Sequence, residues 1–83
     1  MGETKIVQNL HQAALGEHFL VKKVAIQGEL KRRLLDLGFV QDSVVEVLKA
    51  SPLGDPISYR VAGTVIALRK EESQLIYGEV ISS

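Results

Sequence analysis

The sequence predicts a mainly β fold: a small closed barrel of about five strands, with one short α-helix after the first strand and a short helical turn before the last. Three observations support this prediction. Several stretches alternate apolar with polar residues and are rich in valine and isoleucine, which favour strands. One stretch has helical periodicity instead. Gly, Pro and Asp separate the stretches at short intervals, and closure of so small a sheet removes edges that would otherwise stay unpaired.

The first predicted strand spans residues 17–26 and follows a turn at Gly16. Phe19 and Val21 alternate there with their neighbours, and Lys22-Lys23 marks a bend or bulge where the inward face changes. The start of the chain is only weakly patterned. We therefore expect a partly mobile tail over residues 1–8 and a single domain over residues 9–83.

A short helix is predicted over residues 28–37. Leucines recur at i, i+4 and i+7, the spacing of one helix face, and a further leucine widens the stripe: Leu30, Leu34, Leu37 and Leu35. Opposite charges four residues apart predict two ion pairs, each worth about 0.2 to 0.5 kcal/mol: Glu29 with Arg33, and Arg32 with Asp36.

Both ends of this helix carry signals. Gly28 is the expected N-cap, and Glu29 places a negative charge in the first turn. Gly38 is expected to adopt the left-handed conformation that ends a helix, with Phe39 folding back on Leu34.

Four further strands are predicted, over residues 43–49, 57–61, 64–68 and 76–81. In the first of them Val45 and Val47 share one face, and Val44 lies on the other. The connections are a proline-rich turn, a tight hairpin turn and one helical turn, at residues 51–56, 62–63 and 70–74.

The composition restricts the function. Ten basic and ten acidic residues give a net charge of zero, which argues against a nucleic-acid binder and is compatible with a homo-oligomer. The absence of cysteine excludes thiolate ligands and a cysteine nucleophile. No apolar run approaches the roughly 20 residues of a membrane helix, and the start does not have the pattern of a signal peptide. We expect a cytoplasmic protein with no direct membrane insertion.

The sequence contains no catalytic constellation, so we expect no catalytic residue, no cofactor and no enzyme. The glycines are scattered and form no phosphate-binding loop. His11, Glu17 and His18 could gather as ligands of a divalent metal. Adjacent strand residues point to opposite faces, however, so Glu17 and His18 would diverge and a tight metal site is not expected.

Two surface features could bind a partner. Lys31-Arg32-Arg33, with Lys22 and Lys23, is the only basic concentration; it is either a contact for an acidic partner or the solvated face of the helix. The turn over residues 52–56 places Leu53 at a proline-braced tip. Such a loop is either a stiff connection or a pre-organised recognition element, which loses little entropy on binding.

Three segments resemble the FeoA family of small proteins of bacterial ferrous iron uptake. They are residues 29–39 (Glu-Leu-Lys-Arg-Arg-Leu-Leu-Asp-Leu-Gly-Phe), residues 51–56 (Ser-Pro-Leu-Gly-Asp-Pro) and residues 65–70 (Val-Ile-Ala-Leu-Arg-Lys). The resemblance covers about residues 9–81. Gln41-Asp42 departs from the Pro-Gly usual in the family, but Asp tolerates the left-handed backbone that such a turn needs.

The resemblance implies an SH3-like barrel that acts as an accessory or regulatory partner of FeoB, the ferrous iron transporter with a cytosolic GTPase domain. It implies recruitment to the inner face of the membrane by that partner, through contacts on the helix, the proline-rich turn and nearby strand edges. The residues expected in these contacts are Arg32, Arg33, Leu53, Gly54, Asp55 and Pro56.

Two alternatives stay open. Similar SH3-like domains form the C-terminal part of iron-dependent transcriptional repressors, so the chain could be a related regulatory module. It could also be a weak direct Fe(II) binder that uses His11 and His18.

Overall fold

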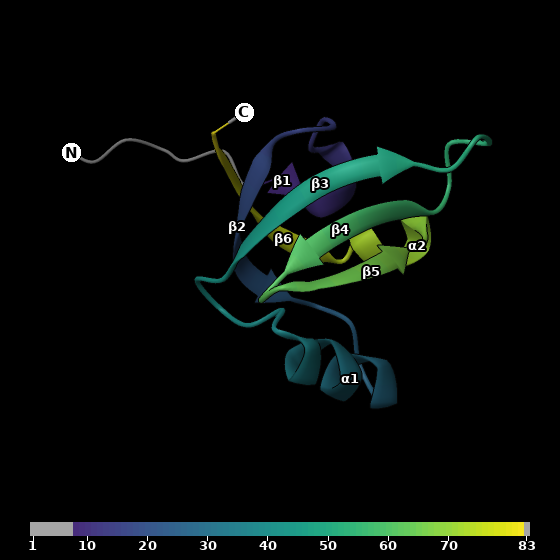
Figure 1. The fold of residues 1–83 in the computed structure, drawn as a ribbon. Helices are drawn as coiled ribbons and strands as arrows, with labels where there is room; N and C mark the ends of the chain where they lie inside the picture. The colour runs from purple at the N-terminus through teal and green to yellow at the C-terminus, as the bar shows by residue number, and fades with distance from the viewer. Residues whose placement is uncertain (1–7, 83) are drawn as a thin grey trace.

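Six antiparallel strands form the one sheet of the structure, a computed structural model that describes residues 8–82 (Figure 1). The elements, in chain order, are β1 (Gln8–Asn9), the 3₁₀ helix η1 (Leu10–Gln12), β2 (His18–Val24), α1 (Glu29–Leu37), β3 (Val44–Ala50), β4 (Ile57–Val61), β5 (Thr64–Leu68), α2 (Lys70–Ser73) and β6 (Ile76–Ser82). The predicted mainly β, SH3-like fold is confirmed. None of the helices in this range is long and apolar enough to cross a bilayer.

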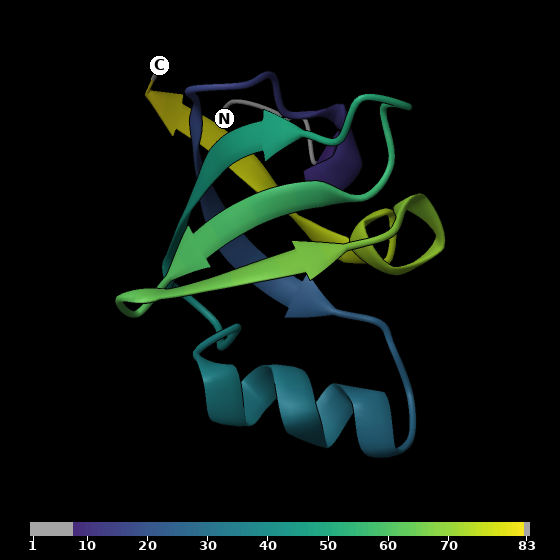
Figure 2. The same cartoon turned by 45° about the vertical axis from the view of Figure 1, so that its right-hand side comes forward.

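The strands lie in the order β1-β6-β2-β3-β4-β5, and the sheet bends around its own core (Figures 1 and 2). Closure by a complete ladder, which the sequence predicted, does not occur: within residues 8–82 no hydrogen-bonded ladder joins β1 to β5. The reason is that β1 has only two residues, which pair with β6. Instead, η1, which follows β1, contacts α2, which follows β5, and these contacts bring the two ends of the sheet together.

The core consists of aliphatic and aromatic side chains from nearly every element. In β4, Ile57, Tyr59 and Val61 are buried in strict alternation, as predicted. In β3, Val45 and Val47 are buried and Val44 is exposed, also as predicted. Phe19 of β2, Leu34 of α1 and Phe39, which follows the end of α1, are fully buried, so α1 and the residues after it cover one side of the core.

The helix α1 begins and ends where the sequence indicated. Gly38 has φ of 114°, and the Phe39 N–H donates to the Leu34 carbonyl at 2.9 Å, the bond of a Schellman motif. Two details differ. Leu35 is 39% exposed and does not widen the buried stripe. Neither predicted ion pair on α1 forms among the described residues, because these exposed side chains gain little by pairing in water.

The bulge predicted at Lys22-Lys23 is confirmed as a register shift of β2 against β6 between Val21 and Lys23. The departure at Gln41-Asp42 keeps its turn, since Asp42 adopts φ of 72°. Lys22 Nζ lies 3.2 Å from Asp42 Oδ1, and the Asp42 N–H donates to the Val21 carbonyl at 2.7 Å. The turn and the bulge therefore support each other.

Neither β1 nor η1 was predicted from the sequence. A capping box holds η1: the Asn9 N–H donates to Gln12 Oε1 at 2.9 Å, and the Gln12 N–H donates to Asn9 Oδ1 at 3.1 Å. Of the predicted tail over residues 1–8, residues 1–7 lie outside the described residues, and Gln8 pairs with Gly78 in β6.

Gly78 lies where β6 passes between β1 and β2. It pairs with Gln8 on one side and Val21 on the other. A Cβ atom at this position would overlap the Leu20 carbonyl oxygen and would lie 2.9 Å from Cε1 of Phe19. Only glycine allows this approach without displacing backbone.

We expect Gly78→Ala to destabilise the fold by at least about 3 kcal/mol, the upper end of what overpacking costs, because the obstacle is backbone. Chemical denaturation measures this free energy. Gly16→Ala is the control: Gly16 has φ of 88° but no atom within 4 Å of an added Cβ, so only the conformational penalty of about 1 to 2 kcal/mol applies. Equal losses of unfolding free energy in the two variants would show that the backbone around Gly78 moves to accommodate the added Cβ.

Candidate functional site

The loop between β3 and β4, residues 51–56, presents the most exposed large apolar side chain of the described chain. Leu53 is 94% exposed. The loop is braced internally: the Ser51 hydroxyl donates to the Asp55 carbonyl at 2.7 Å, and the Gly54 N–H donates to the Ser51 carbonyl at 2.8 Å. The Ser51 N–H donates to the Pro56 carbonyl at 3.0 Å. We call residues 51–56 the Leu53 loop.

Asp55 fastens the Leu53 loop to α2. Its Oδ1 accepts the Lys70 N–H at 2.9 Å, and its Oδ2 lies 3.8 Å from the Arg69 guanidinium. At the same helix end, Glu72 Oε1 accepts the Arg69 N–H at 2.9 Å. Asp55 therefore caps α2 from a distant part of the chain, and its carboxylate is already engaged within the molecule.

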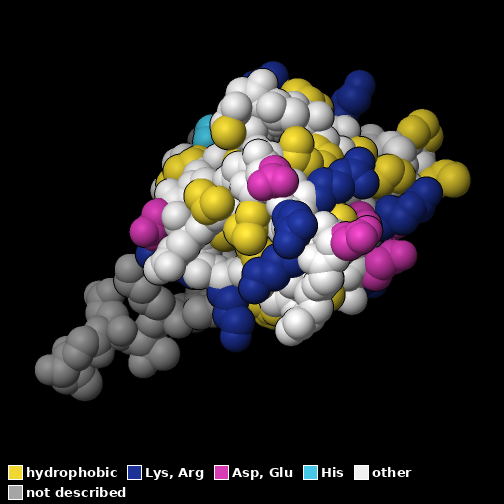
Figure 3. Space-filling view, turned by 90° about the horizontal axis from the view of Figure 1, so that it is seen from below, with side chains coloured by type: hydrophobic (Ala, Val, Ile, Leu, Met, Phe, Trp, Pro, Cys, Tyr) yellow, Lys and Arg dark blue, Asp and Glu magenta, His cyan; other side chains and the backbone are white. Residues whose placement is uncertain are grey.

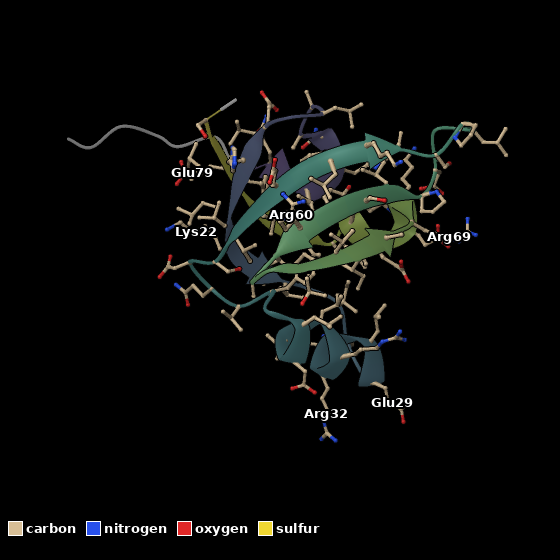
Figure 4. All side chains as sticks on the ribbon, in the orientation of Figure 1. Lys22, Glu29, Arg32, Arg60, Arg69 and Glu79 are labelled. Carbon is tan, nitrogen blue, oxygen red and sulfur yellow. The ribbon has the colours of Figure 1, made fainter. Side chains whose placement is uncertain are left out.

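The predicted basic contact lies elsewhere. Arg32 and Arg33 are exposed on α1, and Arg32 lines a depression of about 440 Å³ together with Gly28 and Glu29. Seen from the α1 side, Lys and Arg side chains lie among hydrophobic ones (Figure 3). Figures 1 and 2 both place α1 at the opposite end of the molecule from the Leu53 loop. In Figure 4, Arg69 lies near the loop whereas Arg32 projects away from it.

The structure thus separates the six predicted contact residues into two groups: the loop residues 53–56, and the two arginines on α1. No compact site contains both. Sequence reasoning could not find this separation, because it depends on the bend of the sheet between them.

The two histidines also lie apart. His11 Nδ1 is 3.4 Å from the Ser73 hydroxyl, which ties η1 to α2, and His18 Nδ1 is 3.2 Å from the Ser82 hydroxyl. Glu17 accepts the Ala14 N–H at 2.7 Å. Across residues 8–82, no three side chains of His, Asp or Glu gather as a metal site would require.

A small polar cluster beneath the Leu53 loop was not apparent in the sequence. Tyr59 and Ser73 are completely buried, and the Tyr59 hydroxyl makes no hydrogen bond of good geometry. Burial raises the pKa of the Tyr59 hydroxyl, while the nearby Ser73 hydroxyl lowers it and the Asp55 charge raises it. No local signal could identify these partners, which come together only through the tertiary fold.

A family model described as the FeoA domain matches residues 8–80. A fusion of Fe(2+) transport protein A with the Fe(2+) transporter FeoB, from Porphyromonas gingivalis, is 32% identical over 74 residues; the match spans 89% of this chain and only 9% of that protein. The solution structure of iron(II) transport protein A from Clostridium thermocellum is 35% identical with a TM-score of 0.82. The alignment with that structure covers 89% of this chain and 46% of the other.

A zinc complex of FeoA from Stenotrophomonas maltophilia is 28% identical with a TM-score of 0.76, over 87% of this chain and 89% of that one. It is described as a prokaryotic SH3 domain protein, with a suggested role as a ferrous iron transport activating factor. A manganese-dependent transcriptional repressor shares the fold, with a TM-score of 0.80 at 19% identity, over 94% of this chain and 43% of its own.

We expect Asp55→Ala to lower the free energy of unfolding by about 1 kcal/mol, as other lost helix caps do. Asp55→Asn retains an acceptor for the Lys70 N–H and should lose only a few tenths. Arg69→Gln removes only the 3.8 Å ion pair and should change stability little. Urea denaturation of the three variants tests this order; a loss in Arg69→Gln as large as in Asp55→Ala would mean that the ion pair, not the cap, holds the loop.

We expect Tyr59→Phe to stay within about 1 kcal/mol of wild type at pH 7, because the hydroxyl that it removes makes no hydrogen bond of good geometry. The pKa of Tyr59 is raised on folding, so the unfolded chain loses this proton first. The contribution of the protonated Tyr59 hydroxyl to the free energy of unfolding is therefore complete below pH about 10. It is lost as the pH rises through the pKa of Tyr59 in the folded protein. Denaturation curves at neutral and alkaline pH should show a smaller alkaline loss in Tyr59→Phe than in wild type. Equal losses would contradict this assignment.

Proposed function

This chain belongs to the FeoA family, and from that premise we propose that it is a non-catalytic accessory protein of ferrous iron uptake. It acts by contact with an FeoB-type transporter at the cytoplasmic side of the membrane. The fusion relative supports this pairing, because it joins the two activities in one polypeptide. Fusion raises the effective concentration of one module at the other, which is useful where the two work in contact.

The Leu53 loop is the proposed primary contact. The observation that carries this assignment is the 94% exposure of Leu53 at the tip of a loop braced by Ser51 and Asp55. An exposed leucine gains from burial in an apolar pocket, at roughly 25 cal/mol per Å² removed from water. A pre-organised loop loses little conformational entropy on binding. Gly54 and Pro56 shape the tip, and Asp55 holds it in place.

Arg32 and Arg33 are the proposed second contact. Both are exposed, and no ion pair engages either of them among the described residues. Because α1 and the Leu53 loop lie at opposite ends of the molecule, a partner that engages both must reach along the length of this protein. Exposed arginines would mainly steer and orient an acidic partner surface.

A regulatory module of a transcriptional repressor is the weaker alternative. The likeness to the manganese-dependent repressor, at 19% identity, bears on the fold alone. Direct Fe(II) binding would need ligands that the described residues do not bring together.

The decisive experiment is an NMR titration of labelled protein with the soluble GTPase domain of the cognate transporter. We expect shifts concentrated on residues 51–56, with a smaller set on α1. Leu53→Glu should abolish the loop shifts and the uptake of ferrous iron in cells while leaving stability unchanged, since the side chain is almost fully exposed.

Leu15→Glu is the matched control, because Leu15 is also an exposed loop leucine, at 57%. It should bind and support uptake as wild type does. Full uptake in a folded Leu53→Glu variant would remove the loop from the model. An absence of shifts at high concentration would reject direct contact with the GTPase domain.

A further inference from the structure

The strand β5 is an edge strand of five residues that lacks the sequence features which usually prevent an edge from pairing with other chains. It pairs with β4 alone, in an unbroken register from Val61–Thr64 to Ile57–Leu68. Its five residues, Thr-Val-Ile-Ala-Leu, include no charge and no proline, and the ladder has no bulge. Edges of soluble proteins usually carry such features to prevent pairing with other chains. The opposite edge, β1, is only two residues long.

The hairpin geometry determines which backbone groups face outward. The turn at Ala62-Gly63 has two residues, both with positive φ (51° and 77°), so Val61 and Thr64 form a hydrogen-bonded pair. Alternation along the ladder turns the N–H and C=O groups of Val65 and Ala67 away from β4. Within residues 8–82 no hydrogen bond reaches these four groups.

This edge is accessible. Thr64, Val65 and Ala67 are all exposed, Val65 by 56%. Figures 1 and 2 both show β5 at the margin of the sheet, with α1 beyond it. An exposed valine beside unpaired backbone groups provides both apolar area and hydrogen bonds to an added strand.

We propose that β5 binds β5 of a second copy of this chain, antiparallel, about a two-fold axis at Ile66. In this register Val65 of one copy faces Ala67 of the other, and both pairs are hydrogen-bonded. The N–H and C=O groups of Val65 and Ala67 in each copy are then all hydrogen-bonded to those of the other copy. The edge is therefore complementary to itself, as an isologous interface must be.

The side chains fit the same register. A larger residue, Val65, lies opposite a smaller one, Ala67, and β5 brings no charge opposite a like charge. On the neighbouring strand, Arg60 is already paired with Glu46 at 3.0 Å. A net charge of zero leaves no long-range repulsion between copies.

The area of two five-residue edges is below the roughly 1,200 Å² of a stable interface. The dimer should therefore be weak, reversible and dependent on concentration. A second copy is the proposed occupant because Val65 and Ala67 are complementary to each other across a two-fold axis and a net charge of zero does not oppose the contact.

Sedimentation velocity from about 10 µM to about 1 mM tests the proposal. We expect the mass of the wild type to rise from 9.1 kDa toward twice that value. Val65→Glu should stay monomeric, because it places carboxylates from the two copies on one face across the axis. The monomer accommodates this change, since position 65 pairs with Arg60 across the hairpin. Val44→Glu is the control: Val44 is exposed by 44% on β3, and this variant should associate as wild type does.

Amide hydrogen exchange provides the second readout. The N–H groups of Val65 and Ala67 should gain protection with concentration in the wild type and in Val44→Glu, but not in Val65→Glu. A wild type that stays monomeric at the highest concentration overturns the proposal. Self-association that survives Val65→Glu, without protection at residues 65 and 67, assigns the interface to another face and also overturns it. Protection of these amides only when the transporter domain is added would identify a foreign strand as the occupant and reject the second copy.

Discussion

The close approach of β6 to β2 at Gly78 is the constraint on which the rest of the fold depends. A side chain there would displace either the Leu20 carbonyl or the ring of Phe19, which lies fully buried in the core. Because the two backbones meet so closely, β6 can pair with β2 on one side and with β1 on the other. That pairing fixes the start of the domain and places η1 against α2. The sheet can then wrap around its core without a ladder between its edges.

From this constraint, a sequence of contacts leads to the Leu53 loop. His11 in η1 contacts Ser73 in α2, and the first N–H of α2, from Lys70, bonds to Asp55 in the loop. Each contact joins residues that are distant along the chain. The loop is therefore held by η1 and α2 as well as by hydrogen bonds within the loop. A loop fastened in this way has a braced backbone around Leu53, which lowers the conformational entropy that binding to an apolar pocket would cost.

Features that depend on neighbours along the chain could be predicted from the sequence; features that depend on distant partners could not. The C-terminus of α1, the bulge at Lys22-Lys23, the hairpin turn and the left-handed Asp42 follow from residue types within a few positions. The strand β1 has no such signal, because two polar residues pair only with distant β6. Asp55 was predicted as a residue of the turn and of the partner contact, and its role as a cap could not be predicted because it requires α2 to lie beside it. The fold was therefore more accessible to sequence reasoning than the candidate site was.

The two proposed contacts differ in the physical term that each supplies. Leu53 has a braced backbone and a short apolar side chain, so its burial yields favourable free energy with little loss of entropy. Arg32 and Arg33 have long, solvated side chains, and their immobilisation costs up to about 2 kcal/mol each, which offsets most of what an exposed ion pair gains. Charges of this kind chiefly raise the association rate and fix orientation. Affinity should therefore reside in the loop, and the choice of orientation in α1. The distance between the Leu53 loop and α1 favours this arrangement. A second contact far from Leu53 resists rotation of the protein on its partner more strongly than one beside Leu53 would.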